Sequence, residues 1–333
     1  MAATQTRTRA TWVRRILLGL LAVIVAVPVV GAVYQGIATR VDRRTYPPPG
    51  KLVDVGGYRL HLYCTGSGSP TVILDALFPG TVSNWAWVQP ELAKTTQVCA
   101  YDRAGLGWSD RGRQPRDAVQ HAGELHTLLT AAAVPGPYVL VGHSWGGLPV
   151  RMFADRYPDQ VAGMALIEAT NPDAWRRLGK PEGVGVDHKL LVVAPFLGRV
   201  GAFRSGLIPS YAADPDLPSP QREQLQAFYD TVKSLQTIRD VDSAFPAALD
   251  QVRHAAGIGA KPLAVVLGTK GDGSVEALRD LFAAQARLST NSITRVVDGA
   301  THAGLVDNQR YAPQTAAAIL AVVQAVRTGK PMA

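Results

Sequence analysis

The fold is decided by residues 138–147, whose sequence is YVLVGHSWGG. The first half of this stretch is a short apolar run of the kind that forms a buried strand, and the stretch that follows it, up to Tyr157, has the length of a helix. Between them Gly142, Ser144 and Gly146 have the spacing G-x-S-x-G. Where a strand, a tight turn and a helix follow one another in this way, the serine lies on the strained turn. Glycines occupy the neighbouring positions at which a side chain would clash. The pattern therefore predicts that Ser144 is a nucleophile beside the N-terminus of a helix.

A serine hydroxyl needs a base within hydrogen-bond reach before it can act as a nucleophile. In sites of this type the base comes last in the chain, which leaves His188, His254 and His302. The first two lie in a stretch that we expect to form a lid, whereas His302 ends the loop DGATH directly after the last predicted strand. We therefore predict that His302 is the general base. His143 is expected to point away from Ser144 across the turn and to serve in packing.

Short apolar runs alternate with helix-like stretches after residue 50. This alternation predicts an α/β fold, a mostly parallel eight-stranded sheet with helices on both faces. The predicted strands are Lys51–Val55, Tyr58–Cys64, Thr71–Leu74, Gln97–Tyr101, Tyr138–Gly142, Val161–Glu168, Leu263–Leu267 and Ser292–Val297. The predicted helices are Trp85–Lys94, Ala118–Ala133, Trp145–Tyr157, Val275–Leu288 and Ala312–Thr328.

The alternation stops between residues 172 and 259. A long structureless loop inside a compact domain is improbable, so we interpret this segment as a helical lid inserted into a core of residues 51–171 and 260–328. It contains an amphipathic run, Gln221–Val241. Its apolar run Leu190–Ile208 fits an apolar substrate or a mouth that faces a membrane, and it fits ordinary core packing equally well.

The N-terminus is divided into a basic tail (residues 1–15), an apolar segment (16–38) and a proline-rich linker (39–50). No charge interrupts Ile16–Val33, and at about 1.5 Å per residue in a helix these 18 residues cover roughly 27 Å, close to the hydrocarbon thickness of a bilayer. The segment is predicted to be a retained transmembrane helix. A cleaved signal peptide remains the alternative, and the protein would then be secreted.

The composition limits the possible partners. The chain has 333 residues, of which 47% are hydrophobic and 18% charged, as in ordinary globular proteins. Its formal net charge of +8 is concentrated in residues 1–44, which hold seven arginines and one acid. The rest carries no basic stripe with interleaved aromatic residues, which argues against nucleic acid as a partner.

The two cysteines, Cys64 and Cys99, each lie in a short strand-like run. If the two strands are neighbours the pair can form one disulfide, which would persist only in an oxidising compartment and would make the catalytic body extracytoplasmic. Two buried free thiols are the alternative.

Several motifs together resemble the α/β-hydrolase fold superfamily of serine hydrolases and esterases over most of the chain from Leu52 to Val326. GHSWGG resembles its nucleophile elbow, DRAGLGWS (residues 102–109) its D-R-x-G-x-G-x-S loop, and GATH its histidine loop. The resemblance implies that its second and fourth strands are neighbours, which favours a Cys64–Cys99 disulfide.

The resemblance also implies an oxyanion hole built from two backbone amides. By position these are the N–H groups of Phe78 and Trp145. The family's H-G-x-P-type loop is replaced here by Ala76-Leu77-Phe78-Pro79, and Leu77 cannot adopt positive φ as freely as glycine.

The acid of the triad is left open between two carboxylates. The family usually takes it from the loop after the seventh strand, where Asp272 stands, and in a minority of members from the end of the sixth strand, where Glu168 stands. Asp272 also fits an ordinary turn between glycines. Glu168 would need a partner to stay ionised at the end of a buried strand.

These residues predict a serine hydrolase that cleaves carboxylic esters of small or medium, apolar acyl groups. No metal or organic cofactor is implied. An aspartate in place of Ser144 would have indicated dehalogenase or epoxide hydrolase chemistry. Acyl transfer to an alcohol, perhydrolysis, and a non-catalytic ligand-binding protein on the same fold are the alternatives. The natural substrate, the acyl-chain length and the oligomeric state are not accessible from the sequence.

Overall fold

Eight strands form one sheet in the computed structural model, which describes residues 2–178, 182–270 and 275–332. The order across the sheet is β1-β2-β4-β3-β5-β6-β7-β8. β1 and β2, and β2 and β4, are antiparallel, whereas every other neighbouring pair is parallel. The strands are β1 (Lys51–Asp54), β2 (Arg59–Thr65), β3 (Thr71–Asp75), β4 (Val98–Asp102), β5 (Tyr138–His143), β6 (Val161–Ile167), β7 (Leu263–Gly268) and β8 (Ser292–Val297). The predicted α/β fold is confirmed.

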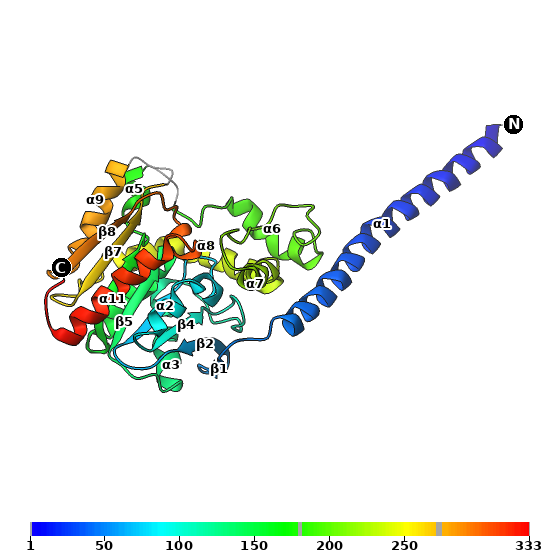
Figure 1. Ribbon diagram of the computed structural model, residues 1–333. Helices are drawn as coiled ribbons and strands as arrows, with labels where there is room; N and C mark the ends of the chain where they lie inside the picture. The colour runs from blue at the N-terminus through cyan, green and yellow to red at the C-terminus, as the bar shows by residue number, and fades with distance from the viewer. Residues whose placement is uncertain (1, 179–181, 271–274, 333) are drawn as a thin grey trace.

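Helices cover both faces of the sheet (Figure 1). The core helices are α2 (Gln89–Ala93), α3 (Ala118–Ala131), α4 (Gly147–Arg156), α9 (Val275–Ala286), α10 (Gly304–Asp307) and α11 (Ala312–Thr328). Short 3-10 helices lie at Val82–Trp85, Ser144–Gly146 and Pro158–Gln160. Fully buried strands explain the continuous apolar runs, because a parallel sheet has no face toward water.

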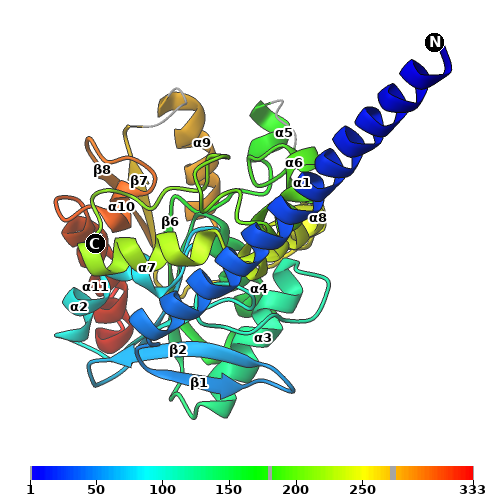
Figure 2. The same cartoon turned by 90° about the vertical axis from the view of Figure 1, so that its right-hand side faces the viewer.

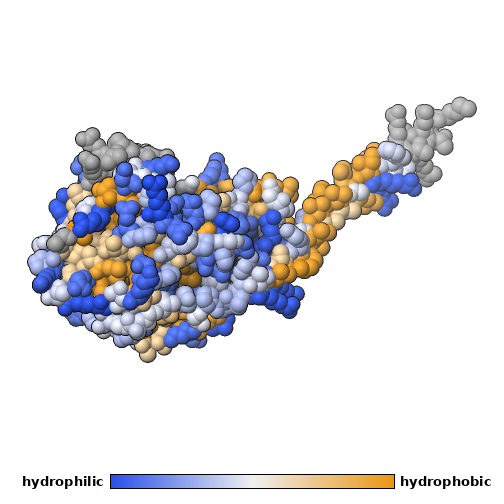
Figure 3. Space-filling model, viewed as in Figure 1, coloured by the Kyte–Doolittle hydropathy of each residue, from blue (hydrophilic) through white to orange (hydrophobic). Residues whose placement is uncertain are grey.

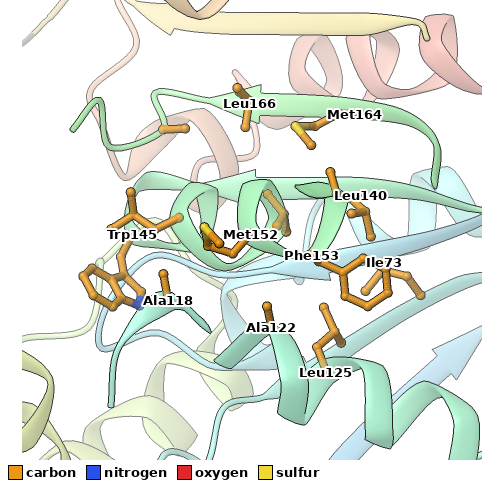
Figure 4. Close-up of a cluster of buried hydrophobic side chains, with 14 of the residues drawn as sticks. Ile73, Ala118, Ala122, Leu125, Leu140, Trp145, Met152, Phe153, Met164 and Leu166 are labelled. Carbon is orange, nitrogen blue, oxygen red and sulfur yellow. The ribbon is translucent and has the colours of Figure 1, made fainter. Parts of the chain in front are cut away.

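Alternate residues of β5 belong to the cores on opposite faces of the sheet. Leu140 packs with Phe153 of α4 and Leu125 of α3, as Figure 4 shows. Val139 and Val141 face the other side and belong to the cluster that includes residues of α11. The two-sided burial holds β5, and therefore the turn that follows it, in the middle of the sheet.

The segment that we expected to form a lid, which we call the lid, contains α5 (Ala174–Leu178), α6 (His188–Arg199), α7 (Ser219–Tyr229) and α8 (Val232–Arg253). The single amphipathic run that we expected over Gln221–Val241 is divided between α7 and α8. The division has a local cause, because the side chain of Thr231 accepts a hydrogen bond from the amide of Ser234 and begins α8 as an N-cap.

The N-terminal helix α1 (Ala2–Thr45) is continuous and leaves the body beside α6 and α7, as Figures 1 and 2 show. The helix extends from Ala2 to Thr45, so it includes residues that we expected in the basic tail (1–15) and in the linker (39–50). The correction has a simple reason: the triple proline that stops the helix begins only at Pro47. The part Thr11–Thr45 is long and apolar enough to cross a membrane, and Figure 3 shows its apolar surface.

The two cysteines are joined by a disulfide, as the resemblance implied. Cys64 of β2 lies directly opposite Cys99 of β4 in the antiparallel register. Because β1 and β2 form the antiparallel edge of the sheet, this bond ties that edge to the parallel strands.

We expect the disulfide to stabilise the fold measurably. It links residues 35 apart in the sequence, and closing a loop of that length contributes about 3–4 kcal/mol to the free energy of unfolding in the chain-entropy model. A variant with both Cys64→Ala and Cys99→Ala should lose that amount in urea unfolding in detergent. Wild-type protein unfolded in the presence of reductant is the control and should show the same loss. Two alkylatable thiols in wild-type protein isolated without reductant would contradict the expectation.

Candidate active site

Ser144 lies on the tight turn between β5 and α4 that the G-x-S-x-G spacing predicts. Its φ is 54°, in the left-handed region that a residue with a side chain rarely adopts. The turn closes because Gly142 and Gly146 lack side chains: a Cβ on Gly142 would lie 2.6 Å from the carbonyl oxygen of Gly146, and a Cβ on Gly146 would lie 2.3 Å from that of Asp75. The backbone therefore holds the serine in a strained conformation against the end of β3.

His302 lies in the loop between β8 and α10, as predicted. Its Nδ1 is 2.6 Å from Oε2 of Glu168. An ionised carboxylate only accepts hydrogen bonds, so Nδ1–H donates to Glu168 and the free nitrogen of the ring is Nε2. His302 is about half exposed, whereas Glu168 is largely buried.

Glu168 follows the last residue of β6 and also has a positive φ, of 37°. Its second oxygen, Oε1, accepts a hydrogen bond of 3.1 Å from the amide of Gly268 at the end of β7. Both carboxylate oxygens are thus engaged, one by the imidazole and one by the backbone. Glu168, one of the two acids that the sequence left open, lies against His302. Asp272 lies outside the described residues.

The register of the sheet brings Ser144 and Glu168 to the same edge. His143 pairs with Ile167 in the parallel ladder between β5 and β6, so the next residues on the two strands, Ser144 and Glu168, leave the sheet side by side. Neighbouring strands are about 4.8 Å apart. The Ser144 hydroxyl makes no hydrogen bond to any residue that the structure describes, so its rotation is not fixed by a partner.

His143 connects the turn of Ser144 to the loop of His302. Its Nε2–H donates to the backbone carbonyl of His302 at 3.0 Å, and the two rings are 4.9 Å apart. Burial, and secondarily the charge of a protonated His302, hold the pKa of His143 well below its usual range. We predicted that His143 points away from Ser144 across the turn and serves in packing. Its side chain also fixes the histidine loop, a role that no sequence pattern indicated.

Arg103 organises the loop that carries Phe78. The buried guanidinium donates to the carbonyl oxygens of Ala76 (2.7 Å) and Leu77 (2.6 Å) and pairs with Asp75. Leu77 is not among the described residues with positive φ, so the loop does not need the glycine that the family has there. Sequence reasoning missed this role, although Arg103 belongs to the D-R-x-G motif that carried the resemblance.

The carboxylate that pairs with Arg103 is deeply buried. Asp75 also accepts a hydrogen bond of 2.6 Å from the Tyr101 hydroxyl. Burial raises the pKa of Asp75, while Arg103 and the Tyr101 hydroxyl, which favour the ionised form, oppose that rise. The hydrogen-bonded cluster of Asp75, Tyr101 and Arg103 connects the ends of β3 and β4 beneath the loop that carries Phe78.

The two residues predicted for the oxyanion hole lie on either side of the turn. The rings of Phe78 and Trp145 are 6.1 Å apart. The amide of Trp145 is in the first turn of a helix, where N–H groups have no intrahelical acceptor. The amide of Phe78 donates to no backbone carbonyl that the structure describes. Among the described residues no group of three or more His, Cys, Asp or Glu side chains is arranged to hold a metal ion.

Comparison with known proteins agrees with this architecture. A family model described as "alpha/beta hydrolase fold" matches residues 72–184. The chain has the α/β-hydrolase fold. The structure of the enol-lactonase from Burkholderia xenovorans LB400 superposes on 82% of this chain and on all of its own chain, with a TM-score of 0.61 and 20% identity. A membrane phospholipase A described as a bacterial virulence factor matches 95% of the chain and 99% of its own, with a TM-score of 0.58 and 21% identity.

Curated relatives match the chain over shorter stretches. The 2-hydroxymuconate semialdehyde hydrolase of Pseudomonas sp. (strain CF600) is 35% identical over 131 residues, which are 36% of this chain and 44% of that protein. The matches span between 18% and 55% of the length of the curated relatives. They cover only part of this chain and only part of each relative.

We predict that His143 makes the stability of this protein sensitive to acid. An unfolded histidine has a pKa of about 6.5, so below that pH the unfolded chain takes up a proton that buried His143 does not. The stabilising contribution is complete above about pH 6.5 and is lost as the pH falls. In the wild type this proton uptake should lower the free energy of unfolding by about 1 kcal/mol between pH 6.5 and 5.5. His143→Gln, which can still donate to the His302 carbonyl, should remove this decrease.

The measurement is urea unfolding of the detergent-solubilised protein at several pH values. The exposed His254 supplies the matched control, and His254→Gln should reproduce the wild-type pH dependence. An unchanged pH dependence in His143→Gln would show that the buried imidazole does not remain neutral.

Proposed function

We propose that the protein is a serine hydrolase that cleaves carboxylic esters through an acyl-enzyme on Ser144. The observation that carries this proposal is the 2.6 Å contact between Nδ1 of His302 and Glu168, at the sheet edge where Ser144 turns out of β5. This contact directs the basic Nε2 of His302 away from the carboxylate and leaves it free to take a proton.

The proposed reaction uses these groups in sequence. Oγ of Ser144 attacks the ester carbonyl while Nε2 of His302 takes its proton. The N–H groups of Phe78 and Trp145 stabilise the negative charge on the carbonyl oxygen of the tetrahedral intermediate. His302 then gives the proton to the departing alcohol. In the second half a water molecule attacks the acyl-enzyme by the same route and releases the acid.

The residue at the elbow favours this chemistry over that of some proteins with the same fold. The structural neighbours include epoxide hydrolases. Fold alone does not identify a reaction. A hydroxyl nucleophile supported by an imidazole and a carboxylate is suited to acyl transfer. An aspartate at this position would instead indicate epoxide hydrolase or dehalogenase chemistry.

We further propose that α1 is retained as a membrane anchor and that the catalytic body is extracytoplasmic. The uncharged run Ile16–Val33 is exposed along its length, which is costly in water and favourable in hydrocarbon. The Cys64–Cys99 disulfide supports an oxidising compartment. An apolar acyl substrate is in keeping with this location.

The first test is covalent labelling with a fluorophosphonate and turnover of p-nitrophenyl esters of increasing chain length. Wild-type protein should be labelled and should hydrolyse at least one ester, and Ser144→Ala should lose both properties. Ser243→Ala, which removes an exposed hydroxyl on α8, is the control and should behave as the wild type. Labelling of Ser144→Ala at the wild-type level would refute the proposed nucleophile. Faster product formation with an added alcohol than with water would identify an acyltransferase.

The second test separates the two candidate acids. Glu168→Gln should lower kcat by roughly 10⁴, because the amide no longer stabilises the imidazolium, while its oxygen can still accept from the Gly268 amide. Asp272→Asn should keep activity within about tenfold of the wild type, since Nδ1 of His302 already has an acceptor. Thermal melts of both variants exclude unfolding. The reverse pattern would assign the acid to Asp272.

A further inference from the structure

Exposed apolar side chains of the body are concentrated in the lid. Outside α1, seven large hydrophobic side chains are exposed in the described part of the chain, and six of them lie between Leu190 and Tyr211. Phe196 is 61% exposed and Leu207 82%. We call Val192, Val193, Phe196 and Leu207 the lid face. A concentration of this kind marks an interaction surface.

One end of the lid face lies against α1. Val192, Phe196 and Val200 are four residues apart, so they form one row along α6 and its C-cap. At Val200 the backbone touches α1 so closely that a Cβ on Gly31 would lie 2.1 Å from the Val200 carbonyl oxygen. The row of apolar side chains therefore ends at the surface of α1 at the level of Gly31.

Gly31 lies within the uncharged run Ile16–Val33, near its C-terminal end. Trp12 and Tyr34, both exposed, flank that run, and aromatic residues in such positions are typical of the two membrane interfaces. Gly31 is three residues from Tyr34, or about 4.5 Å along a helix. The lid thus contacts α1 at the boundary of the segment that would lie in hydrocarbon.

Polar contacts fix the orientation of α1 against the lid. Gln35 is buried and donates to the carbonyl oxygen of Asp230 at 3.0 Å. Arg204 pairs with Asp42 at 2.7 Å and also donates to Gln35. These contacts begin one turn beyond Gly31, so the lid cannot move away from the membrane without breaking them.

Charged side chains surround a cavity between α1 and the body. Arg40, Arg43 and Arg199 line this cavity of about 640 Å³ together with Asp42 and Asp110, and Arg40 and Arg43 lie on α1 beyond Gly31, away from the apolar run. Arg40 is six residues beyond Tyr34, at the level expected for lipid phosphates. The apolar lid face and these cations match the hydrocarbon boundary and the anionic headgroups of one leaflet.

We propose that the lid face lies in the interface of the bilayer that holds α1, so that the lid is a membrane-contacting surface. This inference rests on the proposed retention of α1 as an anchor and goes beyond the proposed reaction. The lid helices α6 and α7 lie between the sheet and α1 (Figure 1), so the body would face the membrane through this part of its lid.

Site-specific fluorescence tests this arrangement in the full-length protein. Both native cysteines are in the disulfide, so one introduced cysteine can be labelled selectively with the environment-sensitive dye NBD. The sites are Phe196→Cys and Leu207→Cys in the lid face, Val23→Cys within α1, and Val296→Cys, an exposed apolar position on β8. Each protein is reconstituted in vesicles of phosphatidylcholine and phosphatidylglycerol that carry a doxyl quencher near the headgroup or near the chain end.

We expect the labels at Phe196 and Leu207 to lose about half of their emission to the shallow quencher, because the lid face would enter only the headgroup and upper acyl region. The label at Val23 should be quenched mainly by the deep quencher, and that at Val296 by neither. Quenching at Val23 without quenching at the two lid positions would overturn the proposal and leave the anchor intact. Absence of quenching at Val23 would refute the anchor, and with it this inference.

Discussion

The site depends on a backbone constraint that two neighbouring strands share. β5 and β6 are paired in parallel, and each is followed by a residue with a side chain and a positive φ, Ser144 at 54° and Glu168 at 37°. Such conformations cost of order 1–3 kcal/mol each and persist only where the surroundings enforce them. These conformations direct both side chains out of the sheet at the same edge, so that they reach the space above it.

The surroundings enforce this geometry by close backbone contacts and buried polar groups. A Cβ on Gly268 would lie 2.4 Å from the carbonyl oxygen of Ala300, so the end of β7 is pressed against the histidine loop. His143 bonds to the same loop from below. On the other side of the turn Arg103 holds two carbonyl groups of the loop that carries Phe78. Few of these contacts involve the reacting groups, yet together they determine where those groups lie.

Much of this architecture could be predicted from the sequence because it follows from local patterns. Apolar runs located all eight strands to within about two residues, and the G-x-S-x-G spacing located the turn of Ser144. The pairing of Cys64 with Cys99 required the strand order, which came from the resemblance and not from the runs themselves. The ends of α1 could not be predicted from the apolar run, because the helix continues through the arginine-rich residues on both sides of it.

The choice between Glu168 and Asp272 could not be made from the sequence. Both carboxylates follow predicted strands, and strand patterns alone do not show that the tertiary fold places Glu168 against His302. The contributions of Arg103 and His143 were inaccessible for a related reason, since each acts on backbone carbonyl groups distant in sequence. A sequence pattern identifies side chains suited to chemistry, but it carries little information about the groups that position them.

The central claim, that Ser144 forms an acyl-enzyme with the help of His302, can be measured directly. Rapid mixing with a p-nitrophenyl ester whose acyl-enzyme is hydrolysed slowly should release a burst of p-nitrophenolate equal to one equivalent per chain. Mass spectrometry of the acid-quenched protein should then find the acyl group on the peptide that contains Ser144. Steady turnover of the same ester, with no burst and no acylated peptide, would contradict the account.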